Sequence, residues 1–157
     1  MGYVSCPKAL VNAPADVVWR LLTEPAGWSK FFDIRVLRVE PPGAAIVGQR
    51  IYGESGPKIL HLGVTMEFTD VDPVRGNLGM MAKLPLGVTV REDLSCSSAG
   101  ETQCRVSYKC NFSFPAGWRG AITRLLLRRE LVVGPSDSLS RLNRAAELQV
   151  SGTDPLP

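Results

Sequence analysis

Long apolar runs and a strong bias of charge are both missing from this 157-residue sequence. No apolar run approaches the roughly 18 residues that a membrane span needs, and the N-terminal segment MGYVSCPKAL lacks the apolar core of a signal peptide. The formal net charge is only +3, and the aromatic residues are not interleaved with a dense run of Lys and Arg, so nucleic-acid binding is not expected. These absences favour a cytoplasmic protein without stable membrane insertion.

Histidine and closely paired cysteines are also scarce. The chain has one histidine, His61, and its four cysteines show no CxxC spacing. Zinc sites are built from closely spaced ligand pairs, so we expect no metal ion, and nothing in the sequence indicates a cofactor. We interpret Cys6, Cys96, Cys104 and Cys110 as small apolar side chains rather than redox groups. The serines stand in no recognisable arrangement with a histidine and an aspartate, so a nucleophilic triad is not expected.

The sequence does contain enough apolar residues for one hydrophobic core. Of its residues, 45% are hydrophobic and 21% are charged, a balance typical of one globular domain that buries about two thirds of its unfolded surface. The 15 glycines and 12 prolines cluster between the patterned segments and mark turns. We expect one domain over residues 1–149 and a flexible tail over residues 150–157. Nothing in the sequence indicates the oligomeric state.

The N-terminal part predicts one strand followed by two short helices. Residues 4–11 have the pattern of a strand, and Asn12 is expected to cap the next helix or to form a turn. Pro25 and Gly27 are expected to stop this helix. Its apolar residues at helical spacing are Val17, Val18, Leu21 and Leu22. The second short helix is expected to carry an aromatic cluster, namely Trp28, Phe31 and Phe32.

Segments that alternate apolar and polar residues fill the middle of the chain, which is the pattern of an antiparallel sheet. The expected strands are residues 34–40, 49–55, 58–72, 78–82, 88–96 and 103–114. Within residues 58–72, one apolar face consists of Leu60, Leu62, Val64, Met66 and Phe68. His61 lies on the opposite face, so we expect it to be exposed rather than catalytic.

The last two strands can be paired as a hairpin with a turn near Gly100. The predicted cross-strand pairs are Cys96–Cys104, Leu94–Val106, Glu92–Tyr108, Val90–Cys110 and Val88–Phe112. Because side chains alternate between the two faces of a strand, all of these residues would lie on one face. We expect this face to form an apolar wall in which Glu92 and Tyr108 are a polar pair.

Helical spacing returns near the C-terminus and predicts one long kinked helix. Its first part has an apolar stripe formed by Trp118, Ala121, Ile122, Leu125, Leu126, Val132 and Val133. Gly134 and Pro135 interrupt the pattern and are expected to kink the helix. The continuation carries Leu139, Leu142, Ala146 and Leu148.

Three stretches of the sequence resemble motifs of a known superfamily. The segment NAPADVVWRLLTEPAGWSKFF is similar to the opening "APxxxVWxLLxDxxxWxxW" of the helix-grip domains. EFTDVDPVRG is similar to their "EVxxVDPPRR", and RLNRAAEL resembles the end of their last helix. Together with the order of elements, these stretches make the chain resemble the START-like superfamily, which includes the pollen allergen Bet v 1, lipid-transfer START domains and the polyketide cyclase/dehydrase group.

The resemblance implies an α+β helix-grip fold. In this fold a curved antiparallel sheet wraps around a long C-terminal helix, two short helices follow the first strand, and an apolar cavity lies between sheet and helix. Members use the cavity for lipid carriage, for hormone or quinone binding, or for ring closure of polyketides. No catalytic residue is shared by the superfamily, so none is carried over to this chain.

Three polar residues are candidates for the inside of such a cavity. Arg129 falls in the middle of the apolar stripe, where a buried guanidinium needs a partner such as Glu92 or a ligand acid. Alternatively, the helix shifts phase near its break and Arg129 reaches solvent. Glu92 and Tyr108 could orient a ligand or transfer a proton, or they could form a buried hydrogen bond with a structural role alone.

The sequence therefore favours a module that binds a hydrophobic small molecule, such as a lipid, a quinone or a polyketide. The alternative is a cyclase, aromatase or dehydratase that uses the polar cavity residues. A third possibility is a structural or regulatory protein with a collapsed core and no ligand. The predicted ligand-binding residues are Glu92, Tyr108, Arg129, Trp28, Phe32, Met66, Met80, Phe112, Ile122 and Leu125. The arginines of the last helix predict a solvated face or, alternatively, a surface for transient membrane contact.

Overall fold

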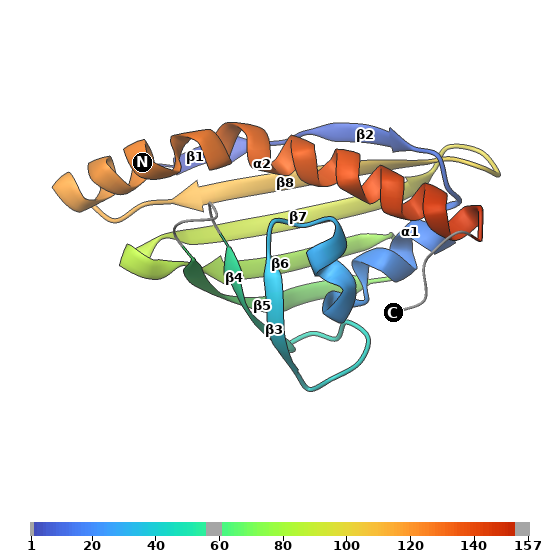
Figure 1. The fold of residues 1–157 in the computed structure, drawn as a ribbon, viewed down its shortest axis with the longest axis horizontal. Coiled ribbons are helices and arrows are strands. Elements are labelled where there is room, and N and C mark those ends of the chain that lie inside the picture. The colour runs from blue at the N-terminus through green and yellow to red at the C-terminus, as the bar shows by residue number, and fades with distance from the viewer. Residues whose placement is uncertain (1, 56–60, 153–157) are drawn as a thin grey trace.

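A curved antiparallel sheet wraps around one long C-terminal helix (Figure 1). The structure is a computed structural model and describes residues 2–55 and 61–152. Within them the sheet has eight strands: β1 (Gly2–Ser5), β2 (Lys8–Val11), β3 (Arg35–Glu40), β4 (Arg50–Ser55), β5 (Leu62–Asp72), β6 (Asn77–Lys83), β7 (Thr89–Ser98) and β8 (Cys104–Ser113). Their order is β1-β8-β7-β6-β5-β4-β3, and β2 also pairs with β8.

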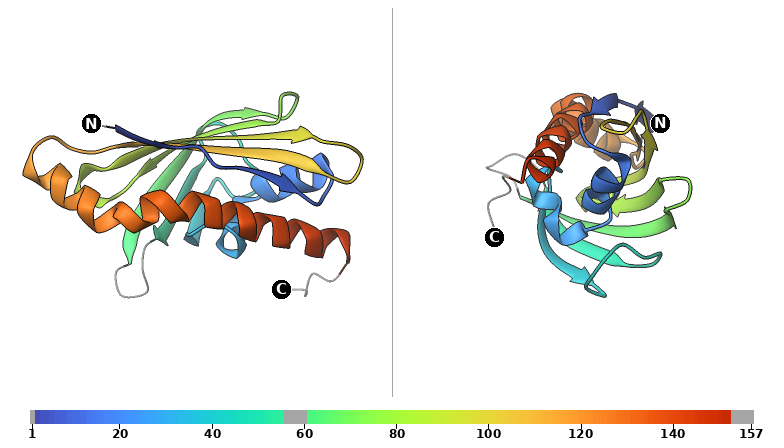
Figure 2. Two further views of the ribbon diagram at one scale, coloured as in Figure 1. Left: turned by 90° about the horizontal axis from the view of Figure 1, so that it is seen from above. Right: turned by 90° about the vertical axis from the view of Figure 1, so that its right-hand side faces the viewer.

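The helices are α1 (Ala15–Leu22), the short 3-10 helices η1 (Pro25–Lys30) and η2 (Pro85–Gly87), and the long α2 (Trp118–Val150). Of these, α1, η1 and α2 lie on the concave side of this sheet, and η2 connects β6 to β7. Viewed end-on, the sheet curls around α1 and α2 (Figure 2, right). The expected helix-grip arrangement of a curved sheet, two short helices and a long C-terminal helix is therefore confirmed.

The expected first strand over residues 4–11 is divided in two. The break falls at Cys6 and Pro7, because proline has no amide hydrogen to donate to a strand ladder. The carbonyl of Pro7 still accepts a hydrogen bond from the backbone N–H of Tyr108, at 3.0 Å. Both short strands therefore remain paired with β8 on either side of the break.

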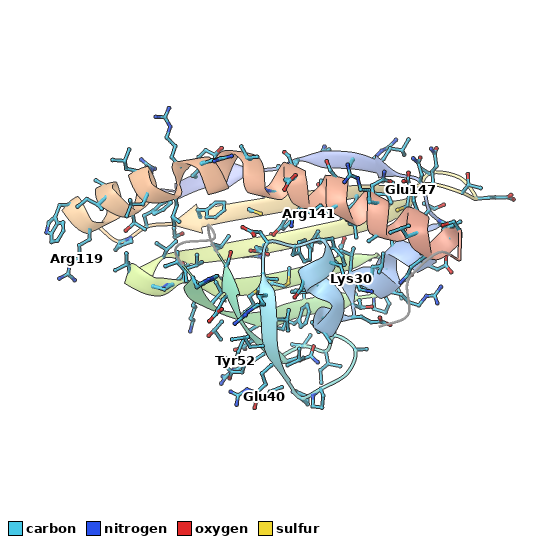
Figure 3. All side chains as sticks on the ribbon, viewed as in Figure 1. Lys30, Glu40, Tyr52, Arg119, Arg141 and Glu147 are labelled. Atoms are coloured by element: carbon cyan, nitrogen blue, oxygen red, sulfur yellow. The ribbon has the colours of Figure 1, made fainter. Side chains whose placement is uncertain are left out.

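Of the two roles expected for Asn12, the helix cap is wrong, and the residue lies instead in a bend that ties the N-terminal region to α2. Pro14 occupies the position before α1, and no side chain caps that helix. The backbone N–H of Asn12 donates to Oδ1 of Asn143 at 2.9 Å, and its Nδ2 donates to Oε1 of Glu147 at 2.8 Å. Glu147 lies near the C-terminal end of α2 (Figure 3). Asn12 thus joins the start of the helical region to the last turns of α2.

Aromatic side chains fill the space between α1, η1 and the sheet. Trp28 of η1 is fully buried, and its indole N–H donates to the carbonyl of Leu22 at 3.1 Å. Its ring meets Phe32 edge-on at 5.1 Å and Phe68 of β5 at 5.5 Å between centroids. The large aromatic residues that follow α1 therefore close one end of the groove between sheet and helix.

The predicted β7–β8 register was wrong by two residues, although the predicted faces were right. The observed pairs on the inner face are Cys96–Val106, Leu94–Tyr108, Glu92–Cys110 and Val90–Phe112. The loop is longer than expected, because the N–H of Ala99 bonds to the carbonyl of Gln103 at 2.9 Å. A shift of two residues leaves every side chain on the same face. Glu92 and Tyr108 are therefore diagonal neighbours rather than direct partners.

The helix α2 continues through Gly134 and Pro135 as one element of 33 residues. Its second half packs into the core through Leu139, Leu142 and Ala146. The predicted apolar stripe of its first half instead faces solvent at the positions whose side chains are described, with Trp118 71% and Leu125 69% exposed. The two stripes lie on different sides of the helix, so one helix cannot bury both against one sheet. The better packed second half sets the rotation.

Two predictions fall partly outside the described residues. Residues 58–60 of the expected strand 58–72 are not described, and β5 begins at Leu62. His61 is exposed. Of the expected tail, residues 153–157 are not described, and Val150 is the last residue of α2. No helix within the described ranges is both long enough and apolar enough to cross a membrane.

Candidate ligand-binding cavity

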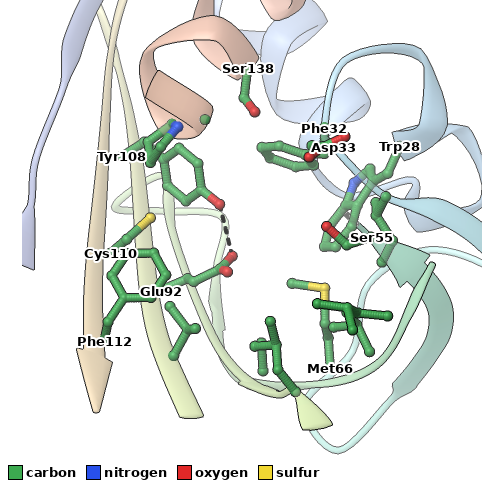
Figure 4. A pocket seen from close by; sticks show the side chains of 18 of the residues that line it. Trp28, Phe32, Asp33, Ser55, Met66, Glu92, Tyr108, Cys110, Phe112 and Ser138 are labelled. Atoms are coloured by element: carbon green, nitrogen blue, oxygen red, sulfur yellow. Dashed lines mark hydrogen bonds between the residues drawn. The ribbon is translucent and has the colours of Figure 1, made fainter. Parts of the chain in front are cut away.

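A cavity of about 140 Å³ lies between the concave face of the sheet and α2 (Figure 4). Its walls are inner-face side chains of β5 to β8, side chains of the η1 region and one face of α2. The apolar lining from the sheet includes Val64, Met66, Ala82, Val90, Cys110 and Phe112. Trp28 and Phe32 line the side near η1, and Leu127 and Pro135 line the side of α2.

The exposure of the lining residues shows where the cavity reaches the surface. Asp33 is exposed, and Ser55, Leu62 and Gly134 are half-buried. These residues come from the segment after η1, from the facing ends of β4 and β5, and from the middle of α2. They form a mouth that is more polar than the interior, where buried apolar side chains dominate.

A carboxyl group and a phenol form the polar pair inside this apolar cavity. The hydroxyl of Tyr108 donates to Oε2 of Glu92 at 3.0 Å. The two residues project from β8 and β7 toward the same space, opposite Trp28 and Ser55 (Figure 4). Both side chains are buried. Among the described residues, no lysine, arginine or histidine lines the cavity, so no cation there neutralises Glu92.

Burial without a cation shifts both ionisations. Loss of hydration raises the pKa of Glu92 from its ordinary 4.5 to about 7, and the hydrogen bond from Tyr108 partly opposes this rise. Burial, together with the nearby charge of Glu92, raises the pKa of Tyr108 well above its ordinary value. Near neutral pH, Tyr108 is therefore a neutral hydrogen-bond donor. Glu92 is divided between its acid and carboxylate forms, so it can donate or accept a proton.

Ser138 is a cavity residue that the sequence pattern did not single out. It projects from α2 toward the cavity (Figure 4) and is buried. Its spacing from Leu142 and Pro135 matches one face of a helix, and this spacing could have placed it on the inner side. The apolar stripe of the first half of α2 predicts a different inner side. Its hydroxyl supplies a second polar group across the cavity from the sheet.

Six of the predicted ligand-binding residues come together around the cavity. They are Trp28, Phe32, Met66, Glu92, Tyr108 and Phe112. Met80 is buried but lies outside the lining. It is paired with Phe68 of β5 on one side and with Glu92 of β7 on the other, so it lies in the core next to the cavity without lining it.

The expected placement of three α2 residues inside the cavity was wrong. Ile122 is 47% and Leu125 is 69% exposed, and Arg129 is exposed as well. All three belong to the stripe that the rotation of α2 turns toward solvent. Arg129 therefore needs no buried partner and does not reach Glu92. The interpretation in which Arg129 reaches solvent agrees with the structure.

Comparison of the sequence with known families agrees with this architecture. Residues 8–147 match the family described as "Polyketide cyclase / dehydrase and lipid transport". The chain belongs to this family. No curated protein matches the sequence. In the ranges that the structure describes, no three His, Cys, Asp or Glu side chains form a group that could hold a metal ion.

Solved structures share the fold of this family member at low sequence identity. The Zhui aromatase/cyclase from Streptomyces sp. R1128 is 16% identical with a TM-score of 0.74, and the match covers 96% of each chain. Norcoclaurine synthase from Thalictrum flavum, in complex with dopamine and hydroxybenzaldehyde, is 14% identical with a TM-score of 0.68, covering 99% of this chain and 90% of the other. DynU16, from the dynemicin biosynthetic locus, is 18% identical with a TM-score of 0.63, covering 93% of this chain and 48% of the other.

Proposed function

We propose that the protein binds a hydrophobic, polyketide-like small molecule in the cavity between the sheet and α2. The observation that carries this proposal is an apolar cavity with one buried carboxyl–phenol pair and a partly polar mouth. Small-molecule sites typically combine an apolar lining with a few placed polar groups. The similarity of the fold to an aromatase/cyclase and to a synthase solved with two aromatic compounds supports an aromatic ligand.

The size of the cavity limits what can be enclosed. A volume of about 140 Å³ is close to that of the engineered cavity of roughly 150 Å³ that holds one benzene. One ring therefore fits inside, and the rest of a larger ligand extends through the mouth. A ring that buries about 150 Å² gains about 4 kcal/mol at roughly 25 cal/mol/Å². That gain alone corresponds to an affinity of about 1 mM.

Tighter binding needs the polar pair or contacts at the mouth. Oε2 of Glu92 accepts a hydrogen bond from the hydroxyl of Tyr108. Among the described residues, no other side chain donates a hydrogen bond to this carboxyl group. Its second oxygen can accept a hydrogen bond from a ligand hydroxyl when Glu92 is ionised, or donate to a ligand carbonyl when it is protonated. The preferred ligand is therefore an aromatic ring that carries a hydroxyl or a carbonyl group.

A cyclase or dehydratase activity is the second candidate function. The pKa of Glu92, about 7, suits a general acid and base at neutral pH. As a carboxylate, Glu92 would take a proton from the carbon next to a ligand carbonyl. The resulting acid would return this proton to a departing hydroxyl, which leaves as water while a carbon–carbon double bond forms. The membership of the chain in a cyclase and dehydrase family supports this alternative.

The binding proposal is tested by titration with 2-naphthol and, as a matched ligand, naphthalene. We expect both to bind, and we expect 2-naphthol to bind about tenfold more tightly at pH 8, where Glu92 is ionised. Glu92→Gln and Tyr108→Phe should reduce this preference without affecting naphthalene. Equal affinity of the wild-type protein for both ligands would contradict the role of the polar pair, and no binding of either would contradict the proposal.

The enzyme alternative needs a turnover assay. A fused-ring β-hydroxyketone loses water to give an absorbing naphthol, so product formation can be followed by absorbance. A catalyst should lose this activity in Glu92→Gln while retaining substrate binding. If the protein only binds the substrate, the wild type and Glu92→Gln should both show the rate measured in buffer alone. A rate above background that Glu92→Gln leaves unchanged would argue against Glu92 as the catalytic group.

A further inference from the structure

Large apolar side chains are exposed along the first half of α2. The exposed fractions are 71% for Trp118, 47% for Ile122, 69% for Leu125, 65% for Leu126 and 51% for Val133. We call these five residues the outer stripe. Single exposed apolar residues are common on protein surfaces, but a continuous group on one helix face marks an interaction site.

Arginines border the outer stripe on both sides. At about 3.6 residues per turn, Arg119 and Arg128 fall on opposite edges of the stripe, and Arg129 falls within it. Arg119, Arg128 and Arg129 are all exposed. From residue 118 to residue 133 the sequence has four arginines and one glutamate. An exposed apolar stripe with basic edges and a tryptophan is the pattern of a helix that lies in the interface of an anionic membrane.

The position of this helix half makes the outer stripe accessible to a flat surface. The first turns of α2 extend beyond the ends of the neighbouring strands (Figures 1 and 2). Arg119 lies at this projecting end, away from the sheet (Figure 3). On the opposite side of the same helix half, Thr123 is buried and Leu127 lines the cavity. The inner side thus faces the protein interior, and the outer side remains exposed to solvent.

We propose that the outer stripe docks the protein onto an anionic lipid surface. Apolar side chains would enter the boundary between headgroups and acyl chains, and the arginines would pair with lipid phosphates. A second copy of the chain is a poorer partner, because a two-fold contact between two outer stripes would bring their arginines together. The docking surface is separate from the polar pair in the cavity, so it does not depend on the proposed ligand.

Vesicle binding by the whole chain tests this proposal. The probes are vesicles of phosphatidylcholine alone and of phosphatidylcholine mixed with phosphatidylglycerol, and binding is measured by co-sedimentation. We expect binding to the anionic vesicles that weakens as the salt concentration rises. Each arginine near the surface contributes roughly fivefold, so the double variant Arg128→Gln/Arg129→Gln should bind about 25-fold more weakly.

Two matched controls separate docking from net charge and from general hydrophobicity. Arg105→Gln/Lys109→Gln removes the same charge from exposed positions of β8 and should leave binding within about twofold or threefold of wild type. Val74→Ser, at a residue 94% exposed in the β5–β6 turn, is the control for Leu125→Ser. Leu125→Ser should reduce binding, and Val74→Ser should not. The tryptophan emission of the bound protein should shift to the blue, except in Trp118→Phe.

Several outcomes would overturn the proposal. They are equal binding to neutral and anionic vesicles, equal losses in the two charge variants, and no vesicle binding at all. Sedimentation velocity without lipid supplies a further test. A dimer that Leu125→Ser dissociates would show that the outer stripe is an interface between copies and would refute membrane docking.

Discussion

The buried carboxyl of Glu92 makes protein stability depend on pH in a specific direction. Its pKa rises from 4.5, its ordinary value, to about 7 in the folded protein, so the folded state holds this proton more tightly than the unfolded state. Well below pH 4.5 the group is protonated in both states and costs nothing. As the pH rises from 4.5 through 7, the unfolded state loses this proton while the folded state keeps it, so stability falls across this range and levels off above it. The difference in pKa corresponds to about 3 kcal/mol, since one pKa unit is about 1.4 kcal/mol.

The substitution Glu92→Gln removes this ionisation while keeping the size of the side chain. We expect the free energy of unfolding of the variant, relative to wild type, to rise by about 3 kcal/mol between pH 4 and pH 8. Urea unfolding at a series of pH values measures this difference. Glu101→Gln, at an exposed position in the β7–β8 turn, controls for the loss of one carboxylate. Parallel stability curves for wild type and Glu92→Gln across this range would refute the assignment of a raised pKa to Glu92.

Three further predictions concern the polar pair, the core beside the cavity and the contact between Asn12 and α2. Tyr108→Phe removes the hydrogen bond that lowers the pKa of Glu92, so we expect the stability loss to begin at the same pH but to continue to a higher pH in the same urea series. Met80→Ala should lower the free energy of unfolding by about 2–5 kcal/mol yet leave naphthalene binding within about twofold, because Met80 is buried outside the lining; a large loss of affinity would contradict this placement. Asn12→Ala removes the side-chain bonds to Glu147 and Gln103. At about 0.5–1.5 kcal/mol for each bond, the variant should lose about 1–3 kcal/mol of stability and show faster hydrogen exchange in the last turns of α2. Unchanged exchange would show that the contact with Glu147 does not hold the helix end.

The sequence was sufficient to predict the fold and the face of most cavity residues. Period-two alternation in β5, β7 and β8 places inner and outer side chains by geometry alone, independent of the exact strand pairing. Glu92 and Tyr108 were therefore expected on one inner face even though the predicted register was wrong. The register is set by the loop from Ala99 to Gln103, which is closed by a hydrogen bond between these two residues. The sequence pattern does not predict this loop length.

The orientation of α2 could not be predicted from helical spacing. Both halves of the helix have apolar stripes, and only packing against the sheet decides which stripe is buried. The second half determines the rotation of α2, because Leu139 and Leu142 pack into the core and because Asn143 and Glu147 accept hydrogen bonds from Asn12. This rotation moves Arg129 to the surface and brings Ser138 to the cavity.

Native mass spectrometry of the protein with added 2-naphthol tests most directly whether the space between the sheet and α2 holds a small molecule. Ala82 lies on β6, is buried and lines the cavity, so Ala82→Phe should fill the space from within. We expect a one-to-one complex for the wild-type protein and none for Ala82→Phe, with a cooperative thermal melt to show that the variant is folded. Equal complex formation by the folded variant would contradict binding in this cavity.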